Sequence, residues 1–178
     1  MNGFCSSGAS PGLVLMCPRY SPTPSAVPRL SVMTQGSQHT AVRLVEIRDE
    51  ALDVNEIIDA LDDVAAGGLT LFIGRVRDHD GGQGVTALDY SAHPTALERL
   101  RDVCDRIAGE HDVHGLAAAH RVGHLEIGDI AVIVATTASH RGVAFAASRA
   151  LIDTLKSEVP IWKHQRFADG GEEWVGLP

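Results

Sequence analysis

The sequence predicts an α+β fold for residues 41–178, with a mostly antiparallel sheet and about three helices. Strand-like segments follow one another through short turns, and only three segments show the helical spacing of apolar residues. Such a mixture is typical of an α+β architecture. No internal repeat is found. A chain of 178 residues with 44% apolar residues has material for a core and is expected to form one domain.

The first predicted elements are a strand, a helix and a second strand. Residues 42–47 alternate as a strand, and Asp53 with Glu56 has the pattern of a helix capping box. The helix is expected to end at the glycine pair 67–68. Its inner face is expected to carry five apolar residues: Val54, Ile57, Ile58, Leu61 and Val64. Residues 69–76 are expected to be a buried strand.

A hairpin and a second helix are expected next. The glycine-rich residues 78–84 indicate a mobile loop, after which residues 85–90 return as a strand. Pro94 stands where a helix can begin. The apolar face of that helix is expected to hold Leu97, Leu100, Val103, Cys104 and Ile107.

Two strands, a third helix and a hairpin complete the predicted domain. Residues 116–122 and 130–138 are expected to be strands, joined through a turn containing Gly123 and Gly128. The third helix is expected at residues 141–157. Its predicted inner residues are Phe145, Leu151, Ile152 and Leu155. Residues 167–175 resemble a terminal hairpin that turns at Asp169-Gly170-Gly171.

Residues 1–40 differ in composition and are expected to be a disordered N-terminal extension. They hold five of the eight prolines, seven serines and four glycines, and only Arg19 and Arg29 are charged. Such a segment cannot bury enough apolar surface to offset its ordering entropy. The apolar run at residues 13–17 is too short for a signal peptide and no basic region precedes it. Met33 is a hypothetical alternative start of translation.

Charge excludes several classes of protein. The chain has 15 basic and 23 acidic residues and a net charge of −8, and the part after residue 40 is near −10. An acidic balance argues against binding nucleic acid by bulk charge. No run of 18 apolar residues is present, so no membrane span is expected. Neither observation argues against a small basic pocket for an anion.

The three cysteines, Cys5, Cys17 and Cys104, form no CxxC pair. Their wide spacing fits a reducing compartment, and a cytoplasmic location is expected. Cys104 lies among apolar residues at helical spacing, which favours a buried structural thiol over a nucleophile.

A first candidate site is the segment Thr136-Thr-Ala-Ser-His-Arg-Gly142 between a strand and a helix. With Ser139 as N-cap, His140 and Arg141 would occupy the first helical turn. Cations there oppose the helix dipole, so an anion is expected to complete the site. A solvated helix start is the alternative.

Lys156 and Lys163 form a second candidate. Lys156 falls in the last turn of the third helix, where a lysine also serves as a simple cap. Lys163 follows an apolar Pro-Ile-Trp segment, and a partly buried lysine can act as acid, base or nucleophile. Two surface lysines are the alternative.

The third candidate is Phe72-Ile-Gly-Arg-Val-Arg77. Gly74 allows close approach of a ligand or another strand, and Arg75 and Arg77 share one strand face. The guanidinium fork suits phosphate, whereas an edge strand with solvated arginines is the alternative.

Metal and nucleotide motifs are weak or absent. The spacings His111-x2-His114 and His120-x3-His124 are only superficially ligand-like, and metal binding is not expected. The chain has no P-loop, no GxGxxG motif and no GxSxG elbow.

Taken together, these segments resemble the large, catalytic subunit of molybdopterin synthase. The resemblance spans about residues 42–176. The matching stretches are Phe72-Ile-Gly-Arg-Val-Arg77, Leu88-Asp-Tyr90, His120-Arg-Val-Gly-His-Leu125, Ser139-His-Arg141, Ala144-Phe145, Ile152-Asp-Thr-Leu-Lys156, Val159-Pro-Ile-Trp-Lys163 and Trp174-Val175. Their order and spacing make the set specific, although each motif is weak alone.

The resemblance implies a sulfurtransferase of molybdenum cofactor biosynthesis with the family's fold. Such enzymes add two sulfurs to cyclic pyranopterin monophosphate and so make the dithiolene of molybdopterin. The sulfur arrives as a thiocarboxylate on the C-terminal Gly-Gly tail of a small ubiquitin-like subunit. A heterotetramer with a homodimeric core is implied, without cofactor, metal, nucleic acid or membrane.

The resemblance also implies the site residues. Lys156 would be the main catalytic lysine, and Lys163 would assist it as a proton donor or clamp. The implied substrate-contacting residues are Arg75, Val76, Arg77, His140, Arg141, Lys156, Lys163, His164 and Gln165. The His-Arg pair would come from the neighbouring protomer. The alternative is a non-catalytic α+β module that binds a phosphorylated ligand or a partner's C-terminal tail.

Overall fold

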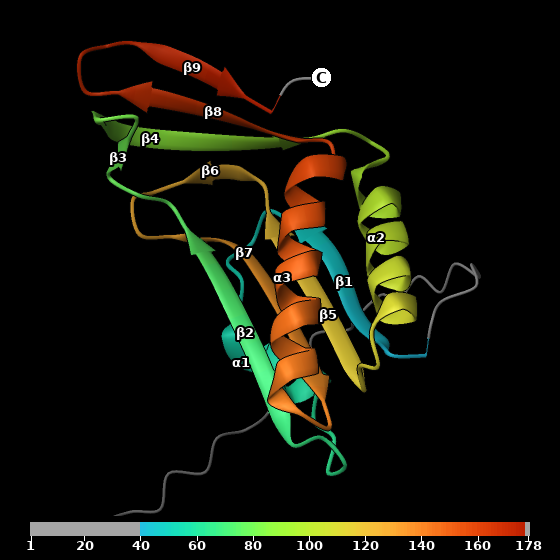
Figure 1. The fold of residues 1–178 in the computed structure, drawn as a ribbon. Coiled ribbons are helices and arrows are strands. Elements are labelled where there is room, and N and C mark those ends of the chain that lie inside the picture. The colour runs from blue at the N-terminus through green and yellow to red at the C-terminus, as the bar shows by residue number, and fades with distance from the viewer. Residues whose placement is uncertain (1–39, 177–178) are drawn as a thin grey trace, which may run out of the picture. The chain divides into compact units, whose positions relative to one another are not determined.

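The computed structural model describes residues 40–176 (Figure 1). The predicted disorder of residues 1–40 therefore lies outside the described residues, apart from Thr40. The final two residues of the predicted domain, 177 and 178, lie outside them as well.

The described residues form three helices and nine strands, which confirms the predicted α+β fold. Their bounds, in chain order, are β1 Val42–Arg48, α1 Val54–Ala60, β2 Gly68–Arg75, β3 His79–Asp80, β4 Gln83–Ala92, α2 Ala96–Glu110, β5 Gly115–Arg121, β6 Gly123–Leu125, β7 Ile130–Ala138, α3 Arg141–Glu158, β8 Ile161–Phe167 and β9 Glu172–Val175.

The larger core is built on a four-stranded sheet in the order β1-β5-β7-β2. β1 pairs with β5 in parallel, and the other neighbours are antiparallel. Alternation along β5 sends Leu116 and Ala118 toward α2 and α3, whereas Ala117 and Ala119 meet α1 on the other face. Figure 1 shows α2 and α3 together on one side of this sheet and α1 behind it. The β5 and β7 strands are therefore buried on both faces.

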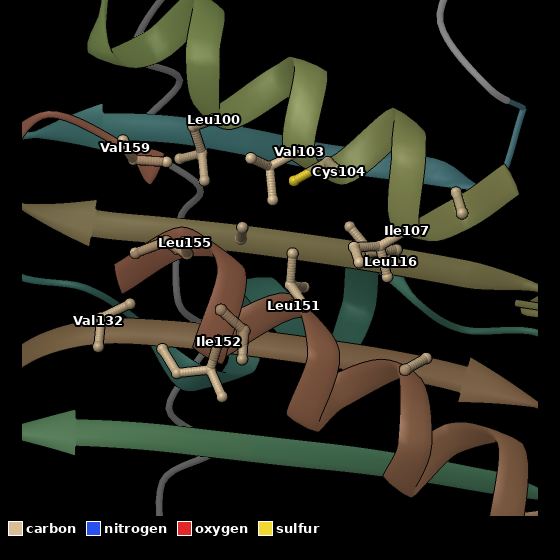
Figure 2. Packing of buried hydrophobic residues seen from close by; sticks show 14 of the residues in the cluster. Leu100, Val103, Cys104, Ile107, Leu116, Val132, Leu151, Ile152, Leu155 and Val159 are labelled. Carbon is tan, nitrogen blue, oxygen red and sulfur yellow. The ribbon is translucent and has the colours of Figure 1, made fainter. Parts of the chain in front are cut away.

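Figure 2 shows how α2 and α3 pack on the sheet. Leu100, Val103 and Ile107 recur at helical spacing on α2 and meet Leu151 and Leu155 of α3 in one cluster. These five side chains are at most 3% exposed, so their burial supplies much of the hydrophobic stabilisation.

Cys104 belongs to the same cluster and is completely buried. Burial raises the pKa of its thiol to about 12, and the nearby charge of Asp105 adds to the effect. The thiol stays protonated and out of solvent, which agrees with the predicted structural role.

A second sheet lies at one end of the first (Figure 1). Its order is β3-β4-β8-β9, and β6 pairs with β4 on the edge away from β8, further along the same edge as β3. Val76, Leu88, Leu125 and Ala131 form a small core there, against which Tyr90 packs. This core joins the end of β2 to the second sheet and thereby positions the candidate site.

The first helix is shorter than predicted. Asp53 is its N-cap and accepts a hydrogen bond from the Asn55 amide, as expected, but the helix ends at Ala60. Asp63 accepts from the Ala65 amide at 2.8 Å, a local turn that competes with helix continuation. Val64, predicted to face the core, is fully exposed.

Residues 78–84, predicted to be a loop, instead contain β3 and the start of β4, which form a tight hairpin. Gly81 and Gly82 form its turn with φ of 57° and 87°, values that glycine adopts without strain. The predicted turn between β5 and β7 likewise contains a short strand, β6, which pairs with β4. The terminal hairpin is confirmed, but its first strand already begins at Ile161.

The third helix confirms most of the prediction for residues 141–157. Its N-cap is His140 rather than Ser139, whose hydroxyl lies 2.8 Å from the His114 ring. Phe145 was predicted to point inward and is 60% exposed. The buried stripe runs through Ala144, and Phe145 stands about 100° further round the helix. Within residues 40–176, no helix is long and apolar enough to cross a membrane.

Candidate active site

A cavity of about 190 Å³ opens where the end of β2, the β3–β4 hairpin, β8 and the end of α3 converge. It brings together residues that are up to 90 positions apart in the sequence. Six of the predicted site residues line it: Arg75, Val76, Arg77, Lys156, Lys163 and Gln165. Four of these six are cations, so the cavity is suited to an anionic ligand.

The backbone at the end of β2 is held firmly in place. A Cβ on Gly74 would lie 2.5 Å from the Val132 side chain, so only glycine permits this close approach to β7. The Val76 amide donates to the Asp129 carbonyl, and the Arg75 Nε donates to the Gly128 carbonyl at 2.9 Å. Val76 is 5% exposed. The arginines thus extend from a fixed base.

Lys163 is held by an aspartate inside the cavity. Its side chain is 22% exposed, and Nζ lies 2.7 Å from Oδ2 of Asp80. The buried Gln165 donates to the same oxygen at 3.1 Å, and Arg77 donates to Oδ1 at 3.3 Å. The hydrogen bond from Lys163, followed by that from Gln165, lowers the pKa of the Asp80 carboxyl. At neutral pH the aspartate is therefore ionised.

Lys156 is the more accessible of the two lysines. It occupies the last turn of α3, where the helix dipole favours a cation, and it is exposed. Its Nζ lies 6.0 Å from the centre of the Phe72 ring, at the outer limit of a cation–π contact. An accessible amine at the cavity is available to an incoming group.

Tyr90 and Asp80 also line the cavity and were missed as site residues from the sequence. Burial, followed by the charge of Asp80, raises the pKa of the Tyr90 phenol, which stays a hydrogen-bond donor at neutral pH. The period-two spacing of Leu88 and Tyr90 was the signal available for Tyr90. For Asp80 the signal was the Asp-Gly-Gly turn, which folds it back toward Arg77.

His140 and Arg141 lie at the other end of α3 from Lys156. Fifteen residues separate Arg141 from Lys156, which corresponds to about 22 Å along a helix. Both side chains are exposed, and His140 makes no side-chain capping hydrogen bond. A single chain therefore does not bring the His-Arg pair to the cavity.

His164 points away from the cavity. It lies between Lys163 and Gln165 on β8, so alternation places it on the opposite face. Its ring stacks on Trp174 with centroids 4.4 Å apart, and Nε2 lies 3.3 Å from Glu172. His164 therefore lies on the face of β8 opposite to the cavity, whereas its neighbours Lys163 and Gln165 line the cavity.

The two histidine pairs have other partners. The His114 ring contacts Asp63 and Ser139, and the His124 ring lies between Asp89 and Glu126. His120 is buried, and its Nδ1 donates to the Arg121 carbonyl at 2.8 Å. Among residues 40–176, no group of three His, Cys, Asp or Glu side chains could hold a metal ion.

A larger hollow of about 650 Å³ lies beside α1. Its walls include Asp59, Asp62 and Asp63 and contain no basic residue. Three carboxylates repel an anionic ligand, so size alone does not make this hollow the better candidate.

Fold and cavity together define an α+β protein with a small cation-lined cavity at the junction of two sheets, a cavity whose charge suits an anionic ligand. The family model described as "MoaE protein" matches residues 47–158. The chain belongs to this family, as the resemblance predicted.

Relatives and solved structures agree with this family. Molybdopterin synthase catalytic subunit 1 of Mycobacterium tuberculosis is 43% identical over 131 residues, covering 73% of this chain and 88% of the relative. The molybdopterin synthase catalytic subunit of Neosartorya fischeri is 34% identical over 158 residues, covering 86% and 84%. A crystal structure of molybdopterin synthase from Staphylococcus aureus matches with a TM-score of 0.69 and 31% identity, covering 75% of this chain and 97% of that one.

Proposed function

We propose that this chain is the catalytic subunit of a molybdopterin synthase. It transfers sulfur from the C-terminal thiocarboxylate of a small ubiquitin-like subunit to cyclic pyranopterin monophosphate. The observation that carries this proposal is one cavity lined by two lysines and two arginines. The relatives' names confirm the predicted place in molybdenum cofactor biosynthesis.

The arginines and lysines have different tasks in this proposal. Arg75 and Arg77 bind the phosphate and stabilise negative charge that develops during transfer. Lys156 is accessible and stands beside the incoming thiocarboxylate as the main catalytic amine. Lys163, partly buried on β8, assists as proton donor or clamp. Val76 forms part of the cavity wall, and Gln165 supplies a fixed hydrogen-bond donor.

The second copy of the chain has a task as well. His140 and Arg141 lie about 22 Å along α3 from the cavity of their own chain, too far to contact the same ligand. We propose a homodimer in which this pair reaches the neighbouring protomer's cavity, with one small subunit bound to each protomer. We place this heterotetramer in the cytoplasm, consistent with the reduced, buried Cys104.

Reconstitution tests the proposed function. Wild-type chain, cyclic pyranopterin monophosphate and a thiocarboxylated small subunit should yield the dithiolene product. Lys156→Ala should lower the rate by about 100-fold or more, because a positioned proton donor contributes roughly that much. Arg106→Ala removes an exposed cation on α2 that pairs with Glu158 of α3, and it should leave the rate unchanged.

Two results would contradict the proposal. Wild-type rates in Lys156→Ala would remove its central catalytic group. Binding of the substrate by the wild-type chain without any dithiolene product would support the non-catalytic binding module instead.

A further inference from the structure

The carboxylate of Asp80 is bound in the cavity in the way a ligand anion would be bound. It accepts from Lys163 at 2.7 Å, from Gln165 at 3.1 Å and from Arg77 at 3.3 Å. Two of these donors carry positive charge, and charge-assisted hydrogen bonds of this kind are the strong ones. The three donors therefore form a ready site for a carboxylate or phosphate, which the protein fills with its own side chain.

The donors are rooted more firmly than the aspartate. Lys163 and Gln165 belong to β8, which is paired on both sides by β4 and β9. Gln165 is 1% exposed and also donates to Glu173 at 2.8 Å. These contacts fix the backbone of both residues and the side chain of Gln165 independently of the aspartate.

Asp80, in contrast, sits near the tip of a small hairpin. β3 has two residues, and its ladder consists of His79 opposite Gly84 and Asp80 opposite Gln83. A Cβ placed on Gly81 or Gly82 would meet no atom within 4 Å, so the turn is surrounded by open space. The open space beside the turn leaves room for the aspartate to move outward.

We propose that Asp80 is an internal anion that an incoming ligand anion displaces from Lys163, Gln165 and Arg77, and that it thereby sets the ligand affinity of the cavity. This inference rests on the proposed function only in requiring that the cavity bind an anion. While the aspartate stays, it occupies the donors and repels a second negative charge. When it leaves, the same donors become available.

Calorimetric titration of inorganic phosphate into the full-length chain tests this inference. Asp80→Asn keeps the size and one acceptor oxygen of the side chain but removes its charge. The Kd for phosphate should fall by about tenfold in this variant, because one like charge next to the bound anion is lost. Asp80→Glu retains the charge and should bind phosphate within about twofold of wild type.

Asp78→Asn is the matched control. It changes the net charge by the same amount on the same hairpin, but the Asp78 side chain is 77% exposed and contacts His79. Screening should limit its effect on the phosphate Kd to about twofold. A Kd for Asp80→Asn equal to or weaker than that of Asp78→Asn would overturn the inference and show that Asp80 orients Lys163 for the ligand.

Absence of phosphate binding to all four proteins would overturn the inference as well. The sulfur-transfer assay with Lys156→Ala measures a reaction rate and does not depend on the phosphate Kd. The proposed function can therefore survive when the displacement of Asp80 fails, and the two failures are distinguishable.

Discussion

His120 is a buried histidine at the end of β5, where its ring meets Tyr90 edge-on with centroids 5.0 Å apart. Burial lowers the pKa of the ring to about 4, and the hydrogen bond to the Arg121 carbonyl only partly opposes this. Because a carbonyl can only accept, Nδ1 carries the proton of the neutral ring. His120 is thus a neutral packing residue beneath Tyr90, which lines the cavity.

The buried ring makes stability depend on pH. Between pH 6.5 and about 4 the unfolded chain binds a proton at His120 that the folded chain does not. The free energy of unfolding therefore has its full value above pH 6.5. It decreases by on the order of 3 kcal/mol as the pH falls to about 4. Urea unfolding at a series of pH values should show a flatter acid dependence for His120→Gln than for wild type.

His93→Gln is the control for this measurement, because His93 is exposed near the start of α2. The acid dependence of His120→Gln should be flatter than that of His93→Gln. Equal slopes for His120→Gln and wild type would show that burial does not keep the His120 ring neutral.

At the scale of elements, one helix carries both stability and chemistry. The buried stripe of α3 packs on α2 and on the first sheet, and its last turn brings Lys156 to the cavity. Leu151 is completely buried and contacts neither solvent nor the cavity. Loss of its side chain should therefore act on folding rather than directly on the ligand.

Leu151→Ala should lower the free energy of unfolding by about 2–5 kcal/mol, because it removes buried methyl groups and leaves a cavity. Arg149→Ala, on the same helix, removes only an exposed ion pair with Asp153 and should change stability by less than about 0.5 kcal/mol. Chemical denaturation of both variants checks the comparison. Similar losses in the two would contradict the assigned packing of α3.

Two element boundaries, the end of α1 and the start of β8, differ from those that the sequence patterns predicted. The apolar spacing around Val64 favours a longer α1, but the Asp63 side chain bonds to the Ala65 amide and ends the helical path. Pro160 and Trp162 obscured the start of β8 at Ile161. Pairing with β4 and β9 makes this segment a strand, and that pairing is not local in sequence.

At the scale of the whole molecule, the fold divides the predicted site residues into two separate groups. Arg75, Arg77, Lys156 and Lys163 meet in one cavity, whereas Arg141 lies at the far end of α3. A composite site across a dimer would reunite them. In an isologous dimer each cavity would then be completed by the partner's helix start.

Mixing two inactive variants tests this arrangement. Lys156→Ala and Arg141→Ala should each lower sulfur transfer by about 100-fold or more when present in both protomers. If they are denatured together and refolded, half the dimers are mixed and half the sites in these are intact. About one quarter of wild-type activity should return. No recovery, with mixed dimers demonstrated by differential tagging, would contradict a shared site.

The sequence alone determined the fold class, most of the elements, the buried role of Cys104 and the family. It did so because apolar periodicity, turn residues and ordered motifs are local properties of the chain. The tertiary structure decided which cations share a cavity, that His164 faces away from it, and that Asp80 holds Lys163. These facts depend on strand pairing and helix packing between distant segments, and no local pattern records such contacts.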